Sequence, residues 1–193
     1  MPGGAPNGLF TKLYGVTVIS ANDAWAVGTL GGNNSHILVE HWDGNNWSAA
    51  AVPHLQGNLL AVAARSPTDV VAVGATFAGG NAQTLIVRWD GKHWIVLPSP
   101  NVGTYDILLG VDIVTRNDAW AIGYSLLPNF VYILMHWDGT SSSLVNGPTA
   151  NGSVLNSLKG FKRRDDTDEA WAVGYKDFGL TSSSFTLHFD GTA

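Results

Sequence analysis

The sequence predicts an all-β protein, a β-propeller of four tandem four-stranded antiparallel blades in which the fourth blade lacks its outer strand. Two short sequence words, alternating four times along the chain, predict this fold. The first word is DAWAVG, which begins at Asp23 and recurs as DVVAVG, DAWAIG and EAWAVG. The second is HWDG, which begins at His41 and recurs as RWDG, HWDG and HFDG. The glycines that close the first word lie 46, 49 and 51 residues apart, so one structural unit repeats.

Each unit contains four short runs rich in β-branched and aromatic residues, as β-strands are. Strand A is expected as GVTVIS from Gly15, strand B is the DAWAVG word, strand C is HILVEHW and strand D is WSAAAVP. In the fourth unit, strand A is expected as GFKRRD from Gly160. The units predict blades over approximately 13–54, 59–98, 108–147 and 158–191 within a single propeller unit, 1–193.

The number of blades in the closed ring stays open at this point. The fourth unit ends at HFDGTA, where strand D is expected to begin, and the N-terminal residues align with a linker between blades. The chain is a segment of a longer propeller, a four-bladed ring, or half of an eight-bladed ring made by two chains. Self-association, as a homodimer or through further blades, is expected because an open row of blades exposes apolar faces at both ends.

The repeated aromatic and turn residues are expected to be structural. Tryptophans in strands B and C are expected to form the core between blades, because each large aromatic side chain buries considerable area. Asp-Gly after strand C suits a tight hairpin that needs positive φ. These structural positions are Trp25, Trp42, Trp89, Trp120, Trp137, Trp171, Asp43, Gly44, Asp90, Gly91, Asp138, Gly139, Asp190 and Gly191.

The histidine of the HWDG word is expected to form a structural hydrogen bond near the turn. His41, His136 and His188 occupy this position, and Arg88 takes it in the second unit. Ring symmetry holds the four positions apart, whereas a metal site needs ligands that converge on one point. We therefore expect no metal site.

The two words together resemble bacterial β-propeller repeats of the DxWAVG…HWDGxxW type, over nearly the whole chain. The WDG element is also similar to WD-repeat propellers, and the broader architecture to kelch-like propellers. WDGxxW, present at Trp42–Trp47 and Trp89–Trp94, resembles an element of some seven-bladed bacterial lectins, and that similarity implies a glycan ligand.

Composition excludes several classes of function. A net charge of −5 disfavours a nucleic-acid surface, which needs clustered Lys and Arg. The absence of Cys removes disulfides, thiolate nucleophiles and cysteine zinc sites. No apolar run is long enough for a membrane span, and the N-terminus lacks the pattern of a signal peptide. The chain is expected to be soluble, while its compartment stays open and includes a segment of an exported or surface protein.

The candidate ligand-binding residues lie in the loops that differ between units. The A–B and C–D turns are nearly the same in every unit, whereas the B–C and D–A connections diverge, as recognition surfaces do on a repeat scaffold. Aromatic residues and asparagines in these loops are the candidates: Asn33, Asn34, Phe77, Asn81, Tyr105, Tyr124, Asn129, Phe130, Tyr175 and Phe178.

The sequence favours a non-catalytic binding or scaffolding propeller that recognises a protein or a glycan through these loops. No nucleophile elbow, metalloprotease motif, P-loop or dinucleotide fingerprint occurs, so we expect neither an enzyme nor a cofactor. Two alternatives remain. One is a structural, self-assembling propeller module without a small ligand, and the other is a glycoside-hydrolase-like enzyme with a carboxylate pair between blades.

Overall fold

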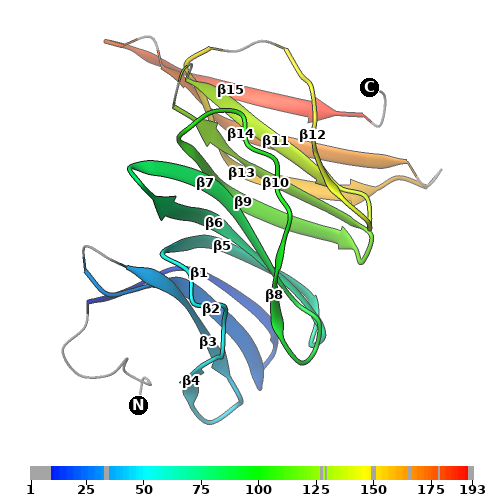
Figure 1. Cartoon of the computed structure of the whole chain (residues 1–193). Helices are drawn as coiled ribbons and strands as arrows, with labels where there is room; N and C mark the ends of the chain where they lie inside the picture. Colours follow the sequence, from blue (N-terminus) through cyan, green and yellow to red (C-terminus); the bar gives the residue numbers. More distant parts are fainter. Residues whose placement is uncertain are drawn as a thin grey trace.

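The structure, a computed structural model, describes residues 10–32, 35–126, 128, 130–148, 151–164, 167–177 and 179–190. Its regular elements are strands, which form four antiparallel sheets in chain order. This confirms the predicted all-β propeller architecture. Figure 1 shows the first blade (blue) and the last blade (orange to red) at opposite ends of an open arc. Within the described residues, no helix has the length and apolar character needed to span a membrane.

Each sheet is a meander of consecutive strands. Blade 1 consists of β1 (Thr11–Ser20), β2 (Asp23–Leu30), β3 (His36–Trp42) and β4 (Trp47–Ala49). Blade 2 consists of β5 (Gly57–Ser66), β6 (Asp69–Ala78), β7 (Asn81–Trp89) and β8 (Trp94–Leu97). Blade 3 consists of β9 (Asp106–Thr115), β10 (Asp118–Ser125), β11 (Val131–Trp137) and β12 (Ser142–Leu144).

Blade 4 has three strands: β13 (Ser153–Lys162), β14 (Asp168–Asp177) and β15 (Ser182–Phe189). The expected loss of the outer strand is therefore confirmed for the part of the chain that the structure describes. The first strands of the blades, β1, β5, β9 and β13, contact one another in succession along the inside of the arc. The apolar side chains between blades form three large clusters, one at each blade boundary, and a smaller fourth cluster also lies between blades 2 and 3.

The first strand of each blade is longer than predicted and contains a β-bulge. β1 begins at Thr11 rather than at Gly15, with a register irregularity between Leu13 and Gly15. A bulge reverses the alternation of inward and outward side chains, which hid the extension in the sequence pattern. Opposite the bulge lies Gly28, the last residue of the DAWAVG word. An added Cβ there would lie 1.8 Å from the carbonyl oxygen of Lys12, which explains why the word ends in glycine.

The predicted alignment of strand A in the fourth unit was wrong by three residues. Val27 pairs with Gly15 in blade 1, and its equivalent Val173 pairs with Ser157 in blade 4. Gly160 therefore occupies the position of Val18 instead of that of Gly15. Five residues separate β13 from β14, whereas two residues separate β1 from β2. This longer turn displaced the alignment.

Candidate functional site

The Asp-Gly turns after strand C share one local structure. The carboxylate of Asp43 accepts hydrogen bonds of 2.8 Å from the backbone N–H groups of Asn45 and Asn46. Gly44 follows with a φ of 95°, a value that glycine adopts without strain. A Cβ on Gly44 would lie 2.9 Å from Asn22, so the A–B and C–D turns of a blade lie side by side.

The same turn recurs in the next two blades. Asp90 and Asp138 accept the equivalent backbone hydrogen bonds, and Gly91 and Gly139 have φ values of 99° and 94°. In all three turns, the backbone N–H groups hold the pKa of the aspartate carboxyl below its usual value. Of the fourth pair, Asp190 directly follows β15, and Gly191 lies outside the described residues.

The expected structural hydrogen bond of the repeated histidine is confirmed, and its partner is the acid that begins strand B. His41 Nε2 lies 2.9 Å from Asp23 Oδ1, His136 Nε2 lies 2.9 Å from Asp118 Oδ1, and His188 Nε2 lies 2.7 Å from Glu169 Oε1. In blade 2, Arg88 Nη2 lies 2.6 Å from Asp69 Oδ1. One hydrogen-bonded pair, a histidine or arginine of strand C with an acid of strand B, therefore ties these strands together in every blade.

At the boundary between blades 3 and 4, this pair extends into a larger charged group. Asp118, His136 and Asp168 place one ligand atom each within 4.8 Å of one another, a grouping that metal sites also show. Lys162 Nζ, however, lies 2.6 Å from Asp168 Oδ1 and already supplies a positive charge. Burial raises the pKa of Asp168, but hydrogen bonds with Lys162 and Asp118 and the nearby charges outweigh it and leave that pKa lowered. We interpret the group as an ion-pair network between blades.

The tryptophans expected in the core occupy different environments. Trp25 and Trp120 are buried between blades, and Trp89 and Trp137 are half-buried at the boundaries before blades 2 and 3. Trp42 is half-buried beside Trp47 in its own blade and belongs to none of the clusters between blades. Trp171 departs from the expectation. Its side chain is 48 % exposed, because none of the described residues packs as a further blade against this face of blade 4.

Four candidate residues from the divergent loops meet on the opposite side of the molecule. Phe77, Tyr105 and Tyr124 pack, partly exposed, around one small group of buried side chains. Phe130 stands edge-on to Tyr124, with ring centroids 5.8 Å apart. We call these four residues the loop-face cluster. They come from the β6–β7 hairpin, the β8–β9 connection and the β10–β11 hairpin, so segments distant in sequence build one aromatic surface.

Buried polar side chains fix the β8–β9 connection that carries Tyr105. The Asp106 carboxylate is fully buried and accepts hydrogen bonds from the backbone N–H groups of Val102 and Gly103. Thr84 of β7 bonds to the same loop through Pro100 and Asn101. The loop is also tied to both neighbouring hairpins, since the Tyr105 carbonyl accepts a 2.9 Å hydrogen bond from Leu126 and the Thr104 carbonyl accepts one from Ala82. The cluster is therefore preorganised.

The environment of Tyr124 shows how close the tyrosines of this face lie. Burial raises the pKa of its phenol, and Tyr105 and Tyr175 raise it further. Tyr175, on β14, therefore lies beside the loop-face cluster, whereas Asn81 stands exposed at the tip of the β6–β7 hairpin. The remaining candidates lie outside the described residues: Asn33, Asn34, Asn129 and Phe178.

Sequence reasoning missed a groove of about 690 Å³ between blades 1 and 2, on the side of the similar turns. Its floor contains Trp25, Trp89 and Trp94, and the rings of Trp25 and Trp94 meet edge to face at 5.3 Å. His41 and Lys92 also line it. The available signal was the second Trp of WDGxxW, which places Trp94 four residues after Asp90.

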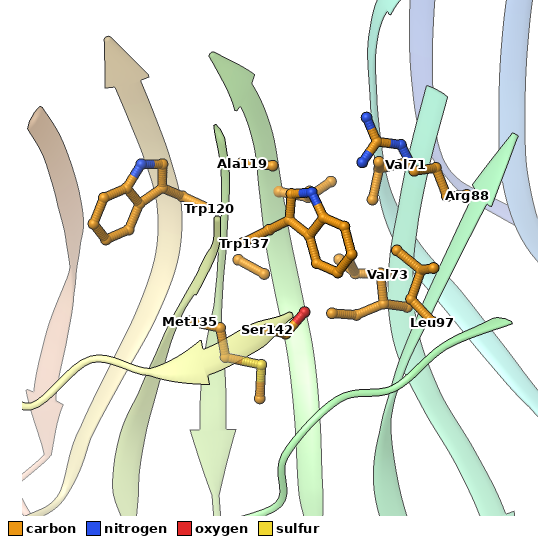
Figure 2. A pocket seen from close by; sticks show the side chains of 12 residues that line it. Val71, Val73, Arg88, Leu97, Ala119, Trp120, Met135, Trp137 and Ser142 are labelled. Carbon is orange, nitrogen blue, oxygen red and sulfur yellow. The ribbon is translucent and has the colours of Figure 1, made fainter. Parts of the chain in front are cut away.

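A smaller void lies between blades 2 and 3. It has a volume of about 20 Å³ and an apolar lining, and Figure 2 shows Trp137, Val71, Val73 and Leu97 around it. Val71 occupies the position that Trp25 and Trp120 occupy in blades 1 and 3. The smaller side chain fills less space, which accounts for the void.

Comparison with known proteins finds likeness among solved structures. No protein-family model matches the chain, and no curated protein sequence matches it. Among solved structures, the chain is similar to that of YCF48 bound to D1 peptide, with 12 % sequence identity and a TM-score of 0.41. The similarity covers 95 % of this chain and 70 % of that chain.

Proposed function

We propose that the chain is a non-catalytic binding module whose ligand contacts the loop-face cluster. The observation that carries this proposal is the convergence of Phe77, Tyr105, Tyr124 and Phe130 from three divergent loops onto one fixed, partly exposed surface. Loops that differ between units and still meet at one place are what a repeat scaffold uses for recognition. Tyrosines give such a surface apolar area together with hydroxyl groups at little conformational cost.

The ligand that fits this surface is a protein segment or a glycan without net charge. The cluster contains rings and phenol groups and no charged side chain. Aromatic rings stack on the apolar face of a sugar, and they equally pack against apolar side chains of a peptide. Both ligands were expected from the sequence, and the experiment below has an arm for each.

The non-catalytic character is supported by how two inner-strand acids are used. The carboxylate of Asp106 holds backbone N–H groups of its own loop. Asp112 accepts a hydrogen bond from the backbone of Gly160 and pairs with Lys159 at 3.0 Å. Both carboxylates thus have structural partners, which favours the binding module over the glycoside-hydrolase alternative.

The test uses a peptide array and a glycan array, probed with the chain and with Tyr105→Ser and Tyr124→Ser variants. We expect one array to show binding that falls at least tenfold in both variants, while circular dichroism shows an unchanged fold. Lys92→Ser, in the groove between blades 1 and 2, is the matched control. Binding that survives both tyrosine changes, or that falls only with Lys92→Ser, would contradict this location.

The second candidate function is a self-assembling module, and the apolar ends of the arc favour it. Leu13, Val16 and Val18 of blade 1 and Trp171 and Val173 of blade 4 are all about half exposed or more. Apolar surface of this kind in a folded chain marks an interaction site. This candidate needs no ligand at the loop-face cluster.

A further inference from the structure

The three boundaries between blades use one repeated pattern of contacts. At each boundary, a strand B side chain of one blade lies in the same buried cluster as a leucine of the next blade's inner strand. The pairs are Trp25 with Leu59, Val71 with Leu108, and Trp120 with Leu155. Every blade therefore has a leading face, which carries the strand B side chain, and a trailing face, which carries the leucine.

Each end of the arc exposes part of one such face. On the trailing face of blade 1 the inner-strand residues are exposed, whereas Ala26, Leu38 and Glu40 of the next two strands are buried. Leu13 has the same strand partner as Leu59, the glycine of the DAWAVG word, yet it is 50 % exposed and Leu59 is 0 % exposed. Trp171 has the position of Trp120, yet it is 48 % exposed and Trp120 is 0 % exposed. Among the described residues, no sheet packs against the trailing face of blade 1 or the leading face of blade 4. The chain thus carries both halves of an interface that it builds three times internally.

We infer that two copies of this chain close into one ring by pairing the leading face of blade 4, with Trp171 and Val173, against the trailing face of blade 1 of the other copy, with Leu13 and Val16. This pairing gives a definite arrangement to the self-assembling candidate, on which it rests. The two contacts are equivalent, so the assembly is a closed dimer with two-fold symmetry. It contains eight blades, within the range that propellers adopt.

Polar side chains on the two end faces match each other. On strand C, the leading faces carry Val39, Ile86 and Leu134, but blade 4 carries Thr186 at this position. The trailing faces carry Val87, Met135 and Leu187, but blade 1 carries Glu40. In each internal boundary, the strand C residue of the leading face lies in the same cluster as that of the facing trailing face: Val39 with Val87, Ile86 with Met135, and Leu134 with Leu187. Head-to-tail pairing therefore brings the exposed Thr186 hydroxyl, a donor, to the face that carries the Glu40 carboxylate, an acceptor that is 8 % exposed.

Head-to-tail pairing with a second copy covers the exposed apolar residues at both ends of the arc, whereas contact between two like faces covers those at one end. Pairing blade 4 with blade 4 would place Trp171 against Trp171 and leave Leu13 and Val18 in water. In the internal boundary between blades 3 and 4, Trp120 instead meets a position without a side chain, since a Cβ on Gly160 would lie 2.9 Å from the indole. In the boundary between blades 1 and 2, the equivalent Trp25 shares its cluster with Ala64, which has the position of Gly160, so both buried leading-face tryptophans face a small residue of the next inner strand.

The first test is the mass of the chain in solution, measured by light scattering after size exclusion over a hundredfold range of concentration. A single species at twice the chain mass of 20.5 kDa is the expected result. A monomer at every concentration overturns the inference together with the self-assembling candidate. A series of larger species that grows with concentration overturns ring closure.

The second test separates head-to-tail pairing from contact between like faces. Leu13→Ser damages the trailing face alone and Trp171→Ser damages the leading face alone, and each is expected to weaken the dimer at least tenfold. Mixing the two variants restores one undamaged contact, so a mixed dimer is expected to form more readily than either variant dimer. Val96→Ser, at an exposed site on β8, is the control and is expected to leave the dimer unchanged.

Two outcomes of the second test contradict the pairing. A dimer that is unaffected by Leu13→Ser leaves self-assembly standing but rejects the trailing face as its surface. A mixture that dimerises no better than the separate variants rejects the head-to-tail arrangement. Binding at the loop-face cluster is measured independently on the arrays, so its loss or presence does not decide either outcome.

Discussion

Arg88 of blade 2 takes the hydrogen-bond acceptor that Trp137 of blade 3 would otherwise use. In blades 1 and 2 the strand C tryptophan donates to the carbonyl of its own A–B turn: Trp42 to Ala21 and Trp89 to Pro67. In blade 3 the equivalent carbonyl, that of Arg116, accepts a 2.8 Å hydrogen bond from Arg88 instead. The Trp137 N–H is left without a partner, while the guanidinium lies 5.9 Å from its ring centroid.

This arrangement predicts how substitutions of Arg88 affect stability. Arg88→Ala removes the 2.6 Å partner of Asp69, whose side chain is 3 % exposed, and leaves only the longer contact with Arg65. We expect a loss of about 3 kcal/mol, because a buried carboxylate loses its main counter-charge. Arg88→His, the residue of the other blades, is expected to cost clearly less. Urea unfolding followed by tryptophan fluorescence measures both, and equal losses would contradict the buried ion pair as the cause.

The glycine that ends each strand B word predicts a second effect on stability. A Cβ at Gly123 would lie 1.9 Å from the carbonyl oxygen of Ile107, so Gly123→Ala requires the inner strand to move. We expect a loss of roughly 3 kcal/mol, the upper range for overpacking a close contact. Gly32→Ala is the control, since a Cβ there meets nothing within 4 Å, and its expected change is within about 0.5 kcal/mol. Thermal unfolding of both variants compares them directly.

The turn carboxylates predict how stability depends on pH. Backbone N–H groups lower the pKa of Asp43, Asp90 and Asp138 in the folded chain. A lowered pKa contributes stability above the unfolded value, about 4, and that contribution is lost as the pH falls through the folded value. The urea midpoint is therefore expected to fall as the pH drops below about 4. A triple Asp→Asn variant should flatten this fall, and an unchanged slope would show that other groups control it.

The proposed ring predicts opposite effects for two neighbouring valines of blade 1. Val18 has the position of Ala64 and Gly160, the small residues in the boundaries that contain Trp25 and Trp120. Val18→Ala is expected to tighten the dimer about tenfold by relieving overpacking against Trp171. Val16 has the position of Val62, Val111 and Leu158, so Val16→Ala should weaken it. Dissociation constants from dilution in size exclusion test both, and changes of the same sign would argue against this alignment of the faces.

The repeat words were sufficient to predict the blades, because each word carries its own local cause. The Asp-Gly turn and the histidine–acid pair both come from residues close together on one hairpin, so spacing alone locates them. The bulge near Leu13 and the shifted register at Gly160 were missed, because a bulge breaks the alternation on which strand patterns depend. Trp171 was misjudged for another reason. Its burial depends on whether another blade packs against this face, and the local sequence of the strand does not predict that.

The candidate site was predictable as a side of the molecule but not as a set of contacts. Divergent loops predicted that Phe77, Tyr105, Tyr124 and Phe130 lie on one side of the molecule, and these side chains do gather there. Their meeting depends on the β8–β9 connection lying between two hairpins, held by Asp106 and Thr84. Such long-range packing leaves no periodic signal in the sequence.

The three-stranded form of blade 4 has a consequence for the periphery of the molecule. Among the described residues, β15 bonds to β14 on one side and leaves the peptide groups of its other side to solvent. An unpaired edge is a template on which a foreign strand aggregates. Ser182, Ser183 and Ser184 at the start of β15 are all exposed. Their hydroxyl groups keep this part of the unpaired strand edge hydrated. The polar start of β15 therefore disfavours edge-to-edge pairing between molecules at the rim of blade 4.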